Sequence, residues 1–148
     1  MTMESIRFRL PFLETAQAQK EVTYNEALAL IDMALHPIVE AVGQDGPPAA
    51  PALGAAWIVG NAPSGEWAGR AWAIAGWTQG GWRFVPASVG MVAWSRSHAT
   101  TVRYFDAGWR IDRVQPIAAP MGGATIDAEC RAAISSILTA LRMQGWLA

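Results

Sequence analysis

Residues 71–85 read AWAIAGWTQGGWRFV, and this stretch decides the fold because it has the pattern of two strands around a tight turn. The turn is Thr78-Gln79-Gly80-Gly81, whose glycines permit the backbone angles that a hairpin needs. A two-residue loop would place Trp77 directly opposite Trp82, whereas a three-residue loop would place Trp77 opposite Gly81. The sequence therefore predicts a β-hairpin, with a ladder of aromatic rings in the first of these two registers.

The hairpin belongs to a longer tryptophan-rich segment. Seven of the eight tryptophans lie between residues 54 and about 113, with glycines at short intervals. This pattern is typical of a meander of short antiparallel strands joined by tight turns. The expected strands are residues 56–59, 71–77, 82–85, 91–96, 101–105 and 109–114.

A second hairpin is expected near the end of this segment. The motif Gly81-Trp82-Arg83-Phe84 is echoed by Gly108-Trp109-Arg110-Ile111, and each motif opens a strand after a turn. Residues 105–109 fit a three-residue loop with Gly108 in the left-handed conformation. Phe105 is then predicted to pair with Trp109.

A helix is predicted before the β segment. Thr23 and Glu26 have the spacing of a capping box, so the helix is expected over about residues 24–35. Its apolar residues recur at steps of three and four and predict one buried stripe, formed by Ala27, Leu28, Ile31, Ala34 and Leu35. Residues 6–10 and 38–42 have the pattern of short strands on either side of it.

A second helix is predicted at the C-terminal end, over about residues 126–144, with Thr125 as its N-cap and Gly145 as its stop. Several of its residues recur at steps of three and four, as in a short coiled-coil seam. A helix packed on its own domain explains the spacing nearly as well. The candidate oligomer-interface residues are Cys130, Ile134, Ile137 and Leu141.

The fold class is therefore α+β: a small antiparallel tryptophan-rich β meander flanked by an N-terminal helix and an amphipathic C-terminal helix. Glycines and three prolines after residue 42 predict an irregular loop. In chain order we expect an N-terminal helix-containing segment, a linker, the tryptophan-rich β domain, a second linker and the C-terminal helix, over residues 1–42, 43–53, 54–114, 115–124 and 125–148.

Composition narrows the classes of function. The chain has 148 residues, enough for one globular domain, and its 52% hydrophobic and 16% charged residues indicate that a partner covers part of the surface. The net charge is −1 and the basic residues are scattered, so no nucleic-acid partner is expected. No membrane insertion is expected, and the N-terminal sequence lacks a secretion signal. We expect the protein in the cytoplasm or carried out in a particle.

No catalytic motif is present in the sequence. His36 and His98 have no motif neighbours, and Cys130 is expected to be a buried, unreactive thiol. Phosphate-binding glycine loops, zinc-binding histidine pairs and nucleophile elbows are absent. We expect no enzyme activity, no cofactor and no metal site, although the twelve acidic residues leave a pair of catalytic carboxylates open.

The tryptophans are the strongest functional signal. Four of them are spaced by five residues, which matches neither the strand period nor the helical period, so turns must bring them together. Rings held rigidly on a sheet stack on sugars or anchor an interface when they are exposed, and otherwise fill the core. Both roles stay open for each ring. The candidate glycan-binding residues are Trp67, Trp72, Trp77, Trp82, Trp94 and Trp109.

The chain resembles a domain family of formally unknown function, DUF2793, which occurs in tailed-phage and gene-transfer-agent gene clusters. The matching motifs are LPFL at residues 10–13, AQAQKEVTYNEAL at residues 16–28, the tryptophan-bearing hairpins, and GGATIDAE at residues 122–129. The block at residues 16–28 is the most specific of these motifs. The resemblance extends over essentially the whole chain.

This resemblance implies a virion structural protein, either a spike or fibre component or an adaptor, located in the virion or a virion-like particle. It implies a homo-oligomer, a trimer by analogy with fibres, in contact with other virion proteins and with host capsular polysaccharide. The family supplies no catalytic residues. The alternative function is a free-standing carbohydrate-binding module that uses exposed tryptophans.

Overall fold

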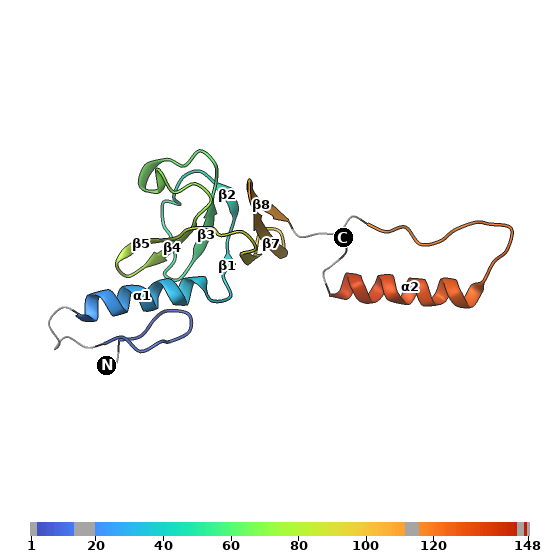
Figure 1. Ribbon diagram of the computed structural model, residues 1–148, viewed down its shortest axis with the longest axis horizontal. Coiled ribbons are helices and arrows are strands. Elements are labelled where there is room, and N and C mark those ends of the chain that lie inside the picture. Colours follow the sequence, from blue (N-terminus) through green and yellow to red (C-terminus); the bar gives the residue numbers. More distant parts are fainter. Residues whose placement is uncertain (1–2, 14–19, 112–115, 145–146, 148) are drawn as a thin grey trace. The chain divides into compact units, whose positions relative to one another are not determined.

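The computed structural model describes residues 3–13, 20–111, 116–144 and 147 (Figure 1). The chain divides into two units, Met1–Arg110 and Ile111–Ala148. The first unit holds helix α1 (Lys20–Ala34) and two four-stranded sheets, and the second holds helix α2 (Ala128–Met143). The expected α+β class, with a helix before and a helix after the strands, is confirmed.

The strands form two mixed sheets rather than one antiparallel meander. One sheet has the order β1-β6-β7-β8 and the other the order β2-β3-β4-β5. β1 is parallel to β6, and β2 is parallel to β3. The strands are β1 Ile38–Val39, β2 Val42–Gln44, β3 Ala56–Val59, β4 Ile74–Thr78, β5 Gly81–Val85, β6 Val92–Ser95, β7 Thr100–Phe105 and β8 Gly108–Ile111.

The parallel strands come from the segment that follows α1. The sequence predicts one strand over residues 38–42, but the chain breaks there and gives β1 to one sheet and β2 to the other. Near the break, the Glu40 amide donates to the Ala56 carbonyl at 2.8 Å. β2 also extends into the segment that was expected to be an irregular loop. The segment that contains β1 and β2 therefore joins the two sheets by pairing with strands far away in the sequence. Such pairing cannot be inferred from local strand patterns.

The hairpin β4–β5 has the two-residue register. Trp77 pairs with Trp82, and in the same register Ala75 pairs with Phe84, so the aromatic ladder is confirmed. The Thr78 hydroxyl donates to the Gly81 carbonyl at 2.8 Å and closes the turn. Gly81 has φ = 90°, a conformation that favours glycine.

The hairpin β7–β8 differs from the prediction. β7 ends at Phe105 and β8 begins at Gly108, so two residues rather than three separate the strands. The Trp109 ring contacts Tyr104, with ring centroids 5.6 Å apart, and the expected pairing with Phe105 is wrong. Gly108, at φ = 135°, is already part of the strand. Both echoed motifs do open a strand, but residues 112–114 of the expected strand lie outside the described residues.

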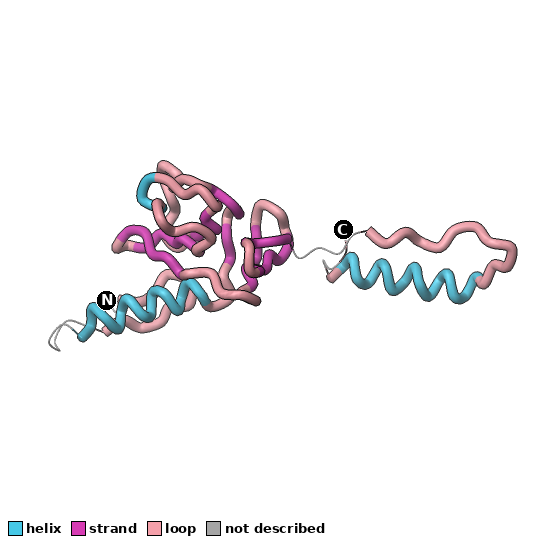
Figure 2. Tube along the Cα trace, turned by 45° about the horizontal axis from the view of Figure 1, so that its top comes forward, coloured by secondary structure: helices cyan, strands magenta, loops and turns pink. Residues whose placement is uncertain are grey.

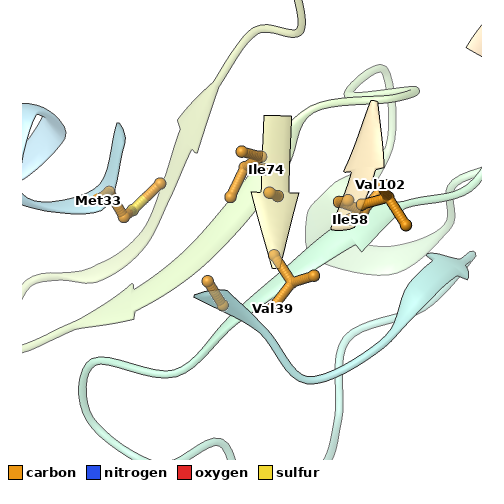
Figure 3. Packing of buried hydrophobic residues seen from close by; sticks show 7 residues of the cluster. Met33, Val39, Ile58, Ile74 and Val102 are labelled. Atoms are coloured by element: carbon orange, nitrogen blue, oxygen red, sulfur yellow. The ribbon is translucent and has the colours of Figure 1, made fainter. Parts of the chain in front are cut away.

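Both faces of β3 are buried. Successive strand residues point to opposite faces, so Ala56 and Ile58 enter one cluster while Trp57 and Val59 enter another. The first cluster lies where β1, β3, β4, β6, β7 and α1 meet, and contains Met33, Val39, Ala56, Ile58, Ile74, Ala93 and Val102 (Figure 3). The second cluster contains Trp57, Val59, Trp67 and Ala75, with Trp67 supplied by the 3₁₀ helix Gly65–Trp67.

α1 begins earlier than expected and buries a different face. It starts at Lys20, so Thr23 lies inside the helix and the capping-box prediction is wrong. Its buried residues are Asp32 and Met33. Four members of the expected stripe are exposed and only Leu28 is half-buried; the exposed residues are Ala27, Ile31, Ala34 and Leu35.

A turn before α1 explains this difference. Residues 6–8 form a turn instead of the expected strand, and a bridge between Glu4 and Pro11 closes its base. The Ser5 hydroxyl and the Phe8 amide donate to the Asp32 carboxylate at 2.7 and 2.6 Å, as does the Arg7 amide at 3.0 Å. The carboxylate is thus satisfied inside the protein by residues far away in the sequence, and the helix turns this face inward.

The Arg7 guanidinium completes the contact by donating to carbonyls at the C-terminal end of α1. Its nitrogens reach the carbonyls of Asp32 at 2.9 Å and His36 at 2.6 Å. These carbonyls have no partner within the helix, so a cation at this end also favours the helix dipole. The N-terminal turn therefore holds α1 at both its buried face and its end.

The second unit consists of α2 and the segment before it. Asp127, not Thr125, is the N-cap, because its carboxylate accepts from the Cys130 amide at 2.9 Å. Gly145, the expected stop, lies outside the described residues. Residues 116–125 run back alongside α2 (Figure 2), and Arg131 and Arg142 donate to carbonyls of this segment.

Candidate functional site

Four tryptophans form one aromatic cluster on one face of the sheet β2-β3-β4-β5. The Trp82 ring lies 5.0 Å from Trp77, 5.1 Å from Trp67 and 5.6 Å from Trp57, measured between centroids. Trp67 has no exposed surface and Trp57 is 8% exposed. Trp77 and Trp82 are half-buried. Of the candidate glycan-binding residues, Trp67 is thus a core residue, and Trp77 and Trp82 are committed largely to packing.

Trp72 and Trp109 connect the loop before β4 to strand β8. The Trp109 indole donates to the Trp72 carbonyl at 2.7 Å. A Cβ on Gly108 would lie 3.2 Å from the Trp72 ring, so glycine permits this close approach. Trp72 itself has φ = 67°, a strained conformation for a bulky residue. Both side chains are half-buried.

Trp94 is the candidate ring that faces solvent. It is 45% exposed, on β6, where exposed and buried residues alternate. Its register partners are Ile38 on β1 and Thr101 on β7. Trp94 therefore stands in the middle of a sheet face, between two paired strands that hold its backbone.

Arginines extend this surface across β7 and β8. Arg103 pairs with Val92 and lies on the same face as Thr101, two residues away. The Arg110 guanidinium stacks over the Phe105 ring, 5.1 Å from its centroid. We call this surface the Trp94 face, and it consists of Ile38, Val92, Trp94, Thr101, Arg103, Phe105 and Arg110. It combines apolar surface with hydroxyl and guanidinium donors.

Only Trp94 of this set was a candidate in the sequence. The alternation of residues 92–95 and 101–105 is a usable signal, because it places Val92 with Trp94 and Thr101 with Arg103 once the two strands are paired. The contribution of Ile38 has no such signal. It depends on the parallel pairing of β1 with β6 across more than fifty residues.

A cavity of about 290 Å³ lies between the N-terminal turn, α1 and the hairpin β4–β5. Its lining includes Met3, Phe12, Val22, Met33 and Trp77. Glu26 and Arg83 form an ion pair of 2.5 Å at this cavity. Asp32 and Asn25 also line it, and both are engaged in hydrogen bonds within the protein. The cavity is therefore mainly apolar, and Asp32, Asn25, Glu26 and Arg83 at its wall are engaged within the protein.

His98 is less isolated than the sequence suggests. Its Nδ1 lies 2.9 Å from the Ser95 hydroxyl and 3.1 Å from the Ser97 hydroxyl. Ser95 is completely buried, so its hydroxyl is out of reach of a substrate. The cluster sits in the turn between β6 and β7, where Ala99 at φ = 49° folds the chain back. This arrangement favours a structural role for His98.

Within the described ranges, no group of three or more His, Cys, Asp or Glu side chains has the geometry to hold a metal ion. Across those same residues, neither helix combines the length and the apolar character that a membrane crossing requires.

The candidate interface residues on α2 differ in exposure. Ile134 and Leu141 are half-buried, beside the buried Leu138. Ile137 is 58% exposed. Cys130 is exposed too, so the expectation of a buried thiol is wrong. The four candidate residues, spaced by four, three and four residues, therefore lie along the boundary between the covered and the exposed side of the helix.

Comparison with known proteins identifies the family but no characterised relative. Residues 24–110, more than half of the chain, match the family described as protein of unknown function (DUF2793), and the chain belongs to this family. The match begins inside α1 and ends in β8, so it spans the eight strands. No curated protein matches, and no solved structure matches.

Proposed function

We propose that this DUF2793 protein is a non-enzymatic structural component of a tailed-phage or gene-transfer-agent-like particle, a spike or fibre part or an adaptor, that binds polysaccharide through the Trp94 face. The observation that carries the proposal is the 45% exposure of Trp94 on a paired central strand. The particle setting comes from the family resemblance. The expected partners are other copies of the chain, other virion proteins and host capsular polysaccharide.

The chemistry of the Trp94 face fits a sugar. The flat face of a pyranose ring presents C–H groups, which stack on an indole, while its hydroxyls need donors and acceptors at the rim. Thr101 lies opposite Trp94, and Arg103 is the diagonal neighbour on the same strand. The sheet fixes these positions before binding, so little conformational entropy is lost when a sugar chain docks.

Self-assembly is the second part of the proposal. Many large apolar side chains remain exposed, including Met121 and Met143 at 89% and 82%. Such surface in a chain that is 52% hydrophobic is typical of a protein that is covered by partners. In a particle, several weak glycan sites on one oligomer would add their affinities.

The glycan test uses the full chain on an array of bacterial capsular and cell-surface polysaccharides, followed by calorimetry on the best ligand. We expect Trp94→Ala to weaken binding at least about tenfold, equivalent to about 1.4 kcal/mol. Val89→Ala is the matched control, because Val89 is 68% exposed in the loop before β6 and lies outside the Trp94 face. Equal binding by the wild type and Trp94→Ala would refute the role of this face.

Particle membership has its own test. The gene is tagged in its host, particles are purified, and mass spectrometry measures whether the protein copurifies with capsid and tail proteins. Light scattering on the purified chain separates the two functions. An oligomer supports a particle component, whereas a clean monomer of about 16 kDa that still binds glycan would favour the free-standing carbohydrate-binding module.

A further inference from the structure

The second unit has very little interior of its own. Among its described residues, the buried apolar side chains are Leu138 and Leu147. α2 has 16 residues, and in proteins most of the stability of a helix comes from the packing of its apolar face. Large apolar side chains of this unit stay exposed instead: Ile117, Met121, Ile126, Ile137 and Met143. Covering this surface would supply the packing that the helix lacks.

The residues of α2 can be divided into two stripes that run along the helix. Each position of one stripe follows a position of the other by one residue, so the centre lines of the stripes lie about 100° apart around the helix axis. The inner stripe is buried or half-buried and consists of Arg131, Ile134, Leu138 and Leu141. Arg131 donates from it to the carbonyl of Pro120 at 3.3 Å, so this stripe serves the unit's own fold. The outer stripe is exposed and consists of Cys130, Ala133, Ile137, Ala140 and the C-cap residue Gln144.

The outer stripe has the spacing of a coiled-coil seam, with alternating steps of three and four from Cys130 to Gln144. It contains no charged residue, so two such stripes meet without burying a charge. We propose that it packs against the outer stripe of a second copy of the chain, with the two helices antiparallel. This inference rests on the self-assembly in the proposed function and names the contact that makes it.

The sizes of the side chains favour the antiparallel direction. In an antiparallel pair centred on Ser135, Ile137 of each helix lies over Ala133 of the other, and Cys130 faces Ala140. In these two layers the larger residue of one helix then meets an alanine of the other, and the two backbones approach evenly. In a parallel pair Ile137 would meet Ile137 and Ala133 would meet Ala133, which alternates crowded layers with voids.

The charges at the helix ends favour the same direction. Asp127 and Glu129 lie at the start of α2, and Arg142 lies in its last turn. An antiparallel pair brings the acidic end of one helix near the basic end of the other and opposes the two helix dipoles. A parallel pair would bring like charges together at both ends. This contact has two-fold symmetry and joins copies in pairs, unlike the trimer that analogy with fibres implies.

Disulfide cross-linking distinguishes the two directions. An oxidant such as copper phenanthroline takes two electrons from two thiols, which lose two protons and form one S–S bond. In Ala140→Cys, the introduced thiol and Cys130 lie on one helix about 15 Å apart, at 1.5 Å of rise per residue, too far for a bond within the chain. The antiparallel pair brings them together between copies, whereas Cys130 stays far from its own counterpart.

We expect oxidised full-length Ala140→Cys to run as a dimer on a non-reducing gel, with a peptide joining Cys130 to position 140. The wild type and the control Thr139→Cys, with its thiol beside the stripe, should stay largely monomeric on the same gel. Efficient dimer formation by the wild type would show a parallel contact and overturn the proposal.

Light scattering before oxidation distinguishes the proposed α2 contact from self-assembly through another surface. A dimer that is weakened by Ile137→Asp supports the proposal. An oligomer that persists in Ile137→Asp, with no cross-link in Ala140→Cys, overturns the α2 contact but leaves self-assembly standing. A monomer at high protein concentration overturns both the contact and the assembly part of the proposed function.

Discussion

The two units of this protein use their apolar residues in opposite ways. In the first unit even the short strand β3 is buried on both faces, between a core shared with α1 and a cluster of four tryptophans. In the second unit a longer helix buries one apolar residue, Leu138, and leaves Ile137 beside it exposed. The first unit contains the packing that a stable fold requires, whereas the second leaves large apolar side chains exposed.

The same contrast between buried and exposed apolar residues applies to the individual tryptophans. Trp67 and Trp94 belong to the same family-matched region, but the first is fully buried and the second is 45% exposed. The number of tryptophans therefore says little about binding. What matters is the face of the strand or loop on which each ring stands.

The largest expected effect is at Trp67. Trp67→Ala removes a completely buried ring from the aromatic cluster and should lower the free energy of unfolding by about 3–5 kcal/mol, or leave the chain unfolded. Guanidinium titration followed by near-UV circular dichroism measures the change. Trp94→Ala serves as the control and should cost less than about 1 kcal/mol. Similar losses for the two variants would contradict the division into core and surface rings.

The next effect concerns the N-terminal turn. Asp32→Ala removes a buried carboxylate that accepts hydrogen bonds from Ser5, Arg7 and Phe8, and leaves those donors unmatched. We expect a loss of about 2–4 kcal/mol in the free energy of unfolding. The control is Glu26→Ala on the same helix, which breaks the half-exposed ion pair with Arg83 and should cost about 1 kcal/mol or less. Urea denaturation compares the two, and an equal cost would show that the turn does not hold α1.

The smallest effect is at the cap of α2. Asp127→Ala should destabilise the helix by about 1 kcal/mol, because the Cys130 amide loses its acceptor. Thr125→Ala should leave the helix unchanged. Hydrogen exchange of the first turn of α2 measures both variants, and a larger effect at Thr125 would restore the N-cap that the sequence alone suggests.

The parts of the fold that the sequence predicts are those decided by neighbouring residues. The register of β4–β5 follows from the chemistry of the turn at residues 78–81, and Trp77 therefore meets Trp82 as expected. The hairpin β7–β8 was misjudged by one residue because Gly108 suits either the loop or the strand. The residues of a turn therefore determine the strand register only when the glycine fits a single position, either in the loop or in the strand.

The parts that escape prediction depend on distant contacts. The buried face of α1 is decided by Asp32, whose partners lie 24 to 27 residues earlier, and a helical period that counts only apolar residues cannot include it. Trp94 was one of six candidate rings, and the sequence cannot separate it from Trp67. Its exposure depends on how β1, β6 and β7 assemble into one sheet.

The most direct test of the contrast between the units is hydrogen exchange of the full chain, followed by mass spectrometry, at low and high protein concentration. We predict that peptides from β3 and β4 are strongly protected at both concentrations. Peptides covering residues 128–143 should become protected only as the concentration rises and a second copy covers α2. Protection of α2 that is strong at low concentration and independent of it would contradict the account.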